Sequence, residues 1–157
     1  MHATVLALHV VSGSAGLLIA PFGLASPKRR GRHTRLGYAY LVAIAGVMLT
    51  SVGLAAFDWS RLWWLAIIGI ATGAAAATGL VVRLRHPPGW EPWHVSFMCG
   101  SYISLVTALL VVNFDSPLPW VLPTIVGSPI IAWAARRAAL RSTPEWQISR
   151  NSHSTTN

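Results

Sequence analysis

The feature that most constrains this 157-residue chain is a series of five apolar stretches, each about as long as a membrane-spanning helix. They cover about residues 4–24, 36–57, 62–82, 95–114 and 118–135. A helix needs ~20 predominantly apolar residues to cross ~30 Å of hydrocarbon, and an open strand edge in lipid would leave backbone groups unpaired. The sequence therefore predicts an all-α, polytopic membrane helix bundle.

The fifth stretch contains two prolines in its interior, Pro123 and Pro129. Proline removes an amide donor and kinks a helix, although membrane helices tolerate this better than soluble ones. We expect four transmembrane helices to form the core and a proline-kinked fifth to lie at the periphery. Residues 1–141 then make a single transmembrane domain, and the polar residues 142–157 form a disordered tail.

The positive charges fall between the apolar stretches and so predict an orientation. The formal net charge is +8, although only 10% of residues are charged, against about a quarter in soluble domains. The cations of the first connection are Lys28, Arg29, Arg30, Arg32 and Arg35. By the positive-inside rule, the amino terminus lies outside and the carboxyl terminus is cytoplasmic, in a bacterial cytoplasmic membrane. Membrane topology accounts for these loop cations, and we expect no nucleic acid partner.

Ionisable residues are few within the stretches, and such residues are costly in a membrane. His9 lies inside the first stretch, whereas His33 and His94 stand at helix entrances, and no carboxylate lies well inside a stretch. This pattern argues against a proton pump or ion-coupled transporter built on buried acids. It also argues against a Ser/His/Asp hydrolase, because Asp58 and Asp115 are expected at the end opposite His33 and His94.

His33 and His94 are the candidate cofactor ligands. The second and fourth stretches run in the same direction, so both histidines are expected at the same depth. The amino terminus of a helix favours neutral imidazole, which is the form that ligates metals. We hypothesise that they bind b-type haem or a metal ion for redox work with a separate redox partner. Arg32 and Arg35 would pair with haem propionates, and His86 is a rival metal ligand in the third connection.

A glycine follows two of the histidines by one helical turn, at Gly13 after His9 and at Gly37 after His33. Residues four apart share a helix face, so each glycine would leave a flat surface beside the imidazole, against which a haem edge can lie. His9 cannot share an iron with His33, because it lies ~22 Å from the inner end of its helix. A second haem near the outer side would need another ligand beside His9, and Met48 is a conceivable one.

We expect His9 instead to hydrogen-bond a neighbour, either Asn113 or Ser12.

The alternative interpretations of these features need no cofactor. His33 would be a solvated loop residue, and His94 an interfacial residue beside Trp93. The protein would then be a non-catalytic membrane protein that binds a partner or anionic lipid through its basic loop, since cations beside a membrane attract anionic headgroups by about 1 kcal/mol each. No catalytic residue is assigned under either hypothesis.

Two further patterns concern packing and depth. Gly69, Gly73 and Ala77 follow one another at four-residue spacing, which allows close approach of helices, within the chain or in a homodimer. Eight tryptophans are expected at the two membrane interfaces, Trp59, Trp63, Trp64 and Trp120 at the outer one and Trp90, Trp93, Trp133 and Trp146 at the inner one.

Two segments carry a family resemblance, residues 8–16 (LHVVSGSAG) and 31–38 (GRHTRLGY). With Trp93-His94 and the helix that follows, they resemble a family of small bacterial multi-pass integral membrane proteins of unknown function. That family has a His-containing first helix, a basic Gly/His loop and a His-x-x-x-Gly-Tyr start to the second helix. The resemblance implies a multi-pass membrane fold. By loose analogy, histidines at helix ends are also similar to those of membrane four-helix b-type cytochromes.

Overall fold

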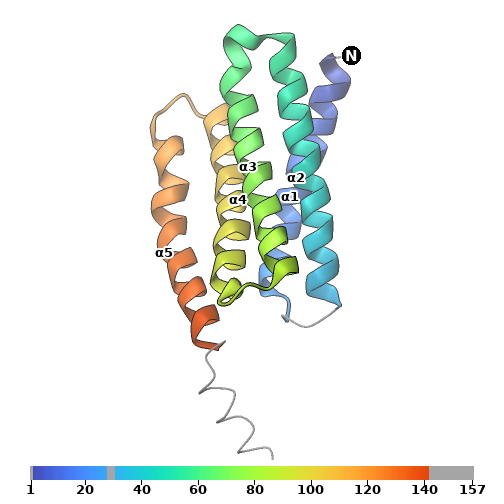
Figure 1. The fold of residues 1–157 in the computed structure, drawn as a ribbon. Coiled ribbons are helices and arrows are strands. Elements are labelled where there is room, and N and C mark those ends of the chain that lie inside the picture. Colours follow the sequence, from blue (N-terminus) through green and yellow to red (C-terminus); the bar gives the residue numbers. More distant parts are fainter. Residues whose placement is uncertain (1, 28–30, 142–157) are drawn as a thin grey trace, which may run out of the picture.

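The computed structural model describes residues 2–27 and 31–141, and it is all-helical over this part of the chain (Figure 1). Five helices follow one another, each long and apolar enough to cross a membrane. Their bounds are α1 His2–Ala25, α2 Arg32–Phe57, α3 Trp59–Arg85, α4 Trp90–Asn113 and α5 Leu118–Arg141. The predicted fold class is therefore confirmed.

Helices α1 to α4 form an antiparallel bundle in which each helix packs on the next and α4 returns to contact α1. Consequently α2 and α4 are parallel and lie diagonally across the bundle (Figure 1). The core side chains come from all four helices, and the main members are Ala20, Tyr40, Ile44, Val47, Ala76 and Leu105. Helix α5 packs against α4 at the side of this bundle, as expected for a peripheral fifth helix. It continues through Pro123 and Pro129.

All five described helices extend beyond the apolar stretches from which they were predicted, and α2, α4 and α5 do so by the most residues. Helix α2 begins at Arg32 and not at about residue 36, α4 begins at Trp90 and not at about residue 95, and α5 continues to Arg141. Apolarity marks the part of a helix that lies in hydrocarbon, whereas the helix itself can continue into the interface. His33 and His94 therefore lie within helices. The predicted disordered tail, residues 142–157, lies outside the described residues.

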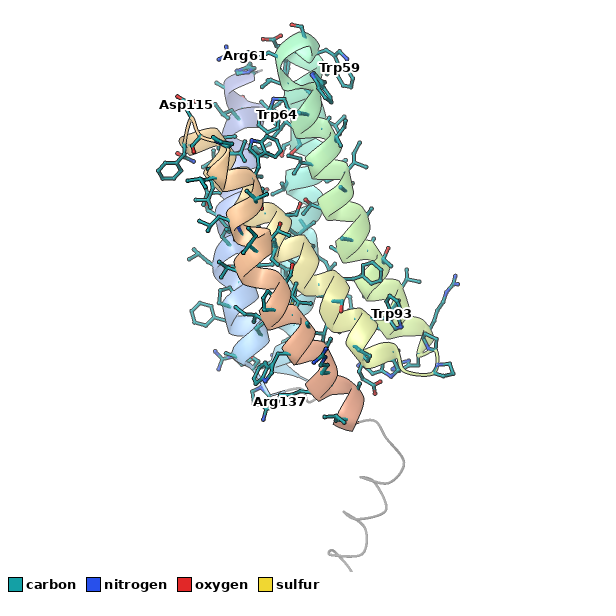
Figure 2. The ribbon with its side chains drawn as sticks, turned by 90° about the vertical axis from the view of Figure 1, so that its left-hand side faces the viewer. Trp59, Arg61, Trp64, Trp93, Asp115 and Arg137 are labelled. Atoms are coloured by element: carbon teal, nitrogen blue, oxygen red, sulfur yellow. The ribbon has the colours of Figure 1, made fainter. Side chains whose placement is uncertain are left out.

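The two ends of the bundle differ in charge. Figure 2 shows Trp59, Arg61, Trp64 and Asp115 at one end, with Trp93 and Arg137 at the other. We call the second end the cationic end, and its described arginines are Arg32, Arg35, Arg83, Arg85, Arg136 and Arg137. Trp64 and Trp120 meet edge to face at the opposite end, with ring centroids 5.9 Å apart. Aromatic residues thus occur at both ends of the apolar region, as at membrane interfaces.

The glycines of α3 are used for packing within the chain. A Cβ at Gly69 would lie 2.6 Å from the Cβ of Ser51 in α2, and a Cβ at Gly73 would overlap the Sδ of Met48. Ala77, by contrast, is exposed. Of the two packing alternatives, Gly69 and Gly73 therefore follow the intramolecular one, and they allow α2 and α3 to approach closely.

Candidate functional site

His33 is held at the cationic end by a hydrogen bond to α1. It is the second residue of α2, it is half-buried, and its Nδ1 lies 3.0 Å from the carbonyl oxygen of Gly23. A carbonyl oxygen can only accept, so the ring donates from Nδ1 and keeps its lone pair on Nε2. Gly23 lies in the last turn of α1, and its carbonyl also accepts the backbone N–H of Ser26 at 3.3 Å. The bond from His33 therefore joins α2 to the end of α1 and fixes the tautomer of His33.

His94 makes the equivalent hydrogen bond to α3. It lies in the second turn of α4 and is half-buried, and its Nδ1 is 2.8 Å from the carbonyl oxygen of Gly79. Gly79 is buried, and a Cβ there would lie 3.0 Å from Cγ and Sδ of Met98. The missing side chain thus lets α4 approach closely enough for this bond. As in His33, the ring carries its proton on Nδ1 and its lone pair on Nε2.

A buried hydrogen bond shows how the two histidines are related. The hydroxyl of Ser101 in α4 donates to the carbonyl of Met98, so the hydroxyl of Tyr40 in α2 donates to Ser101 across 2.9 Å. His33 precedes Tyr40 by seven residues, and His94 precedes Ser101 by seven. Seven residues make about two turns, so each histidine shares a helix face with its partner and lies ~10.5 Å closer to the cationic end. His33 and His94 therefore lie at the same depth on the inward faces of diagonally opposite helices.

The inward face of α2 is open beside His33. From Tyr40 onward this face is buried, with Tyr40 3% exposed, Ile44 2% and Val47 5%. Gly37 continues the same face toward His33, but a Cβ placed on Gly37 would have no atom within 4 Å. At Gly13, one turn after His9, a Cβ would meet the Cγ2 of Val47 at 3.9 Å. Of the two glycines that follow a histidine by one turn, Gly37 has the open space predicted for a haem edge and Gly13 does not.

His86 lies at the cationic end but has a different environment. It is exposed, it ends α3 with a positive φ of 45°, and its Nε2 accepts a hydrogen bond from Nη1 of Arg83 at 2.7 Å. Its ring meets Trp90 edge to face at 4.9 Å, and Trp90 lies 6.0 Å from the ring of His94. His86 is thus linked to His94 through the ring of Trp90.

No group of three or more His, Cys, Asp or Glu side chains that could hold a metal ion occurs within residues 2–27 and 31–141. Arg32 and Arg35 lie in the first turn of α2, on either side of His33 in sequence, and both are exposed. In the described part of the chain, the cationic end therefore has His33 and His94 with arginines nearby, but no group of three or more metal-binding side chains.

His9 pairs with Thr50 of α2, and not with Asn113 or Ser12 as expected. Its Nδ1 lies 3.0 Å from Oγ1 of Thr50, whose own proton goes to the carbonyl of Gly46 at 2.6 Å. The amide of Asn113 bonds instead to the carbonyl of Leu109 in its own helix. The suggested pairing of His9 with Met48 is also wrong, because Met48 packs against Gly73 on the α3 side of α2.

Sequence reasoning missed the two residues that connect α2 and α4. Tyr40 and Ser101 are 3% and 0% exposed, yet a tyrosine and a serine within apolar stretches give no signal of their partner. The available signal was spacing, because each residue follows a candidate histidine by seven positions.

Comparison with known proteins adds no relative. A scan against protein-family models, a search of curated proteins and a search of solved structures each found no match. The resemblance to small bacterial membrane proteins of unknown function therefore stays a prediction.

Proposed function

We propose that this is a membrane redox protein that binds b-type haem between His33 and His94. The observation that carries the proposal is the matched pair of Nδ1 hydrogen bonds to the carbonyls of Gly23 and Gly79. Histidines that ligate a metal through one nitrogen almost always donate the other ring N–H to a carbonyl, carboxylate or water. Both imidazoles have this arrangement at the same depth, on helices that face each other across the bundle.

Haem suits a two-histidine site better than a bare metal ion does. Protein-bound zinc takes three or four side-chain ligands, whereas a porphyrin supplies four nitrogens and leaves only axial positions to the protein. No cluster of three such ligands occurs in the described part of the chain. His86, the further metal candidate, has its Nε2 engaged by Arg83. These contacts favour the haem form of the hypothesis over the metal form.

Other features of the cationic end are also compatible with bound haem. The open face at Gly37 would accept the edge of a flat macrocycle beside His33. Arg32 and Arg35 would pair with the propionates, because guanidinium groups form strong charge-assisted bonds with carboxylates. When bound, the haem would supply one-electron chemistry, and the chain would hold it, neutralise its carboxylates and limit access of water. A separate redox partner would exchange the electrons.

The proposal is tested by visible absorption spectra of the detergent-purified protein, expressed with haem supply, before and after reduction by dithionite. We expect a Soret band and sharp reduced bands, which are lost in His33→Ala and in His94→Ala. His86→Ala and His9→Ala are matched controls that should keep the spectrum. A folded, colourless protein despite adequate haem would refute the proposal, and so would full spectra in both site variants.

We also propose that the cationic end faces the cytoplasm of a bacterial cell, so that the amino terminus lies outside. The arginines of the cationic end outnumber Arg61, which lies with Asp58 and Asp115 at the other end, and this asymmetry supports the orientation under the positive-inside rule. In a Cys99→Ala background, single cysteines at Ser116 and Pro88 test it with a membrane-impermeant maleimide on intact cells. We expect labelling at position 116 and not at position 88, and the reverse pattern would overturn the orientation.

A second candidate function is the binding of anionic lipid or a partner through the basic connection between α1 and α2. The exposed side chains of Arg32 and Arg35 favour it. On this hypothesis, Ala at both histidines would be silent, whereas neutralising Arg32 and Arg35 would weaken retention of anionic lipid in native mass spectra. The orientation must be measured in the same variant, because loop cations also determine topology.

A further inference from the structure

A groove between α3, α4 and α5 has no role in the proposed haem function. It has a volume of about 370 Å³, which is within the range of roughly 300–1,000 Å³ found for small-molecule sites. Its polar lining comes from Ser104 and Thr107 of α4 and from Trp120, Thr124 and Ser128 of α5, and its apolar wall includes Ile68 of α3. Trp120 lies near the end opposite the cationic end, so the groove runs from there toward the middle of the bundle.

The groove contains hydroxyl groups but no charge. None of its lining residues is acidic or basic. The hydroxyls of Ser104 and Thr72 are hydrogen-bonded at 2.7 Å, and the hydroxyl of Thr107 donates to the carbonyl of Ile103 in its own helix. Thr124 and Ser128 are exposed, and neither hydroxyl bonds to another residue in the described part of the chain. Hydroxyls without partners are costly in hydrocarbon, so this wall would gain from a ligand that can hydrogen-bond.

The prolines of α5 add polar atoms to the same stretch of helix. Pro123 and Pro129 have no N–H, so the carbonyls of Pro119 and Ile125 lack the donor that a continuous helix would supply. Both prolines lie within the segment of α5 that lines the groove. The segment thus carries hydroxyl groups, which donate or accept, together with backbone carbonyls, which only accept.

We propose that this groove binds a quinone, a neutral bilayer-soluble ring with carbonyl oxygens when oxidised and hydroxyl groups when reduced. Serine and threonine hydroxyls can donate to the carbonyls and accept from the reduced hydroxyls, so one set of side chains serves both forms. A phospholipid headgroup is charged and would call for arginine or lysine, which the groove lacks. The exposed α5 wall allows access from the bilayer. This site goes beyond the proposed haem function, and binding to it does not require haem.

The test is photolabelling of the full-length protein in phosphatidylcholine nanodiscs with an azido-substituted decyl benzoquinone. We expect saturable labelling that unlabelled decyl benzoquinone displaces, with adducts mapped by mass spectrometry to α4 and α5. In the double variant Thr124→Val and Ser128→Ala, half-saturation should require about tenfold more probe, since two hydrogen bonds are lost. Thr78→Val is the matched control, because Thr78 is exposed on α3 outside the groove and bonds to Ala74.

A second variant keeps the result decisive if the double variant fails to fold. A Cβ at Gly100 has no atom within 4 Å, and this residue lines the groove, so Gly100→Leu should fill the groove and abolish labelling. Labelling that does not saturate, that maps to other helices, or that survives both sets of substitutions would overturn the proposal. Displacement by added phospholipid but not by the unlabelled quinone would also overturn it and would identify a lipid site. Haem content is irrelevant to each outcome, so the two proposals can fail separately.

Discussion

The substitution Gly79→Ala tests the contact that holds His94. The added Cβ would lie 3.0 Å from Cγ and Sδ of Met98 and 3.3 Å from Cβ of Phe97, which is tighter than ordinary van der Waals contact. Met98 follows His94 by one turn on the same face of α4. If α4 moves away to relieve the contact, the 2.8 Å bond from His94 to the Gly79 carbonyl must lengthen. One methyl group should therefore affect both packing and the histidine.

The expected magnitude follows from three terms. Overpacking costs about 1–3 kcal/mol, and an interhelical hydrogen bond in a membrane contributes about 0.6 kcal/mol. Replacing a helical glycine by alanine returns about 0.5–1 kcal/mol. We expect a net loss of about 2 kcal/mol in the free energy of unfolding, dominated by the overpacking term. Loss of helical circular dichroism during titration with SDS, from mixed micelles, measures this quantity.

Gly100→Ala is the matched control, because it is also a glycine within a helix but has open space at its Cβ. It should gain about 0.5–1 kcal/mol from helix propensity alone. If Gly79→Ala proves as stable as Gly100→Ala, the packing argument for His94 fails. A destabilised Gly79→Ala that still binds haem normally would show that the bond to Gly79 does not position the imidazole.

Three further substitutions test other parts of the bundle. Tyr40→Phe removes the hydroxyl that bonds to Ser101 and should lower the free energy of unfolding by about 0.5–1.5 kcal/mol in the SDS titration, whereas an unchanged value would mean that this contact between α2 and α4 adds no stability. Gly37→Leu should lower the ratio of Soret to protein absorbance without lowering the free energy of unfolding, because its side chain enters open space; an unchanged ratio would remove Gly37 from the site. Thr50→Val leaves the Nδ1–H of His9 without its acceptor and should lower the free energy of unfolding by about 1–3 kcal/mol. The haem absorption spectrum should not change, and its loss would instead implicate His9 in haem binding.

The fold was predictable because a bilayer leaves few alternatives. Five apolar stretches permit only helices, short connections make consecutive helices antiparallel, and the fifth helix has two internal prolines where α1 has one. The helix starts at Arg32 and Trp90 were placed four to five residues too late, because the interfacial residues before each apolar stretch are polar and still helical. Glycines with positive φ at Gly31, 128°, and Gly89, 68°, directly precede these starts. Such glycines mark helix boundaries that hydropathy does not detect.

The site was only partly predictable, because partners on other helices depend on rotation about each axis. The common depth of His33 and His94 followed from chain direction alone. The acceptors Gly23 and Gly79 could not be foreseen, since a backbone carbonyl has no signal in the sequence. The hydrogen-bond partner of His9 was predicted wrongly for the same reason, because it depends on how α1 and α2 are rotated toward each other. Ser12 and Thr50 carry the same hydroxyl group, so residue type does not choose between them, whereas the α1–α2 contact brings Thr50 within reach.

His9, His33 and His94 finally show why a hydrogen bond alone does not define a ligand. His9, His33 and His94 all donate from Nδ1, so all three have the tautomer suited to ligation through Nε2. What separates them is their surroundings. Beside His9 the next turn is covered by Val47, whereas beside His33 the corresponding face is open at Gly37. His94 lies at the depth of His33 and on the diagonally opposite helix. For a cofactor held by two side chains, an open face and a partner at equal depth are the discriminating features, and only His33 with His94 combines them.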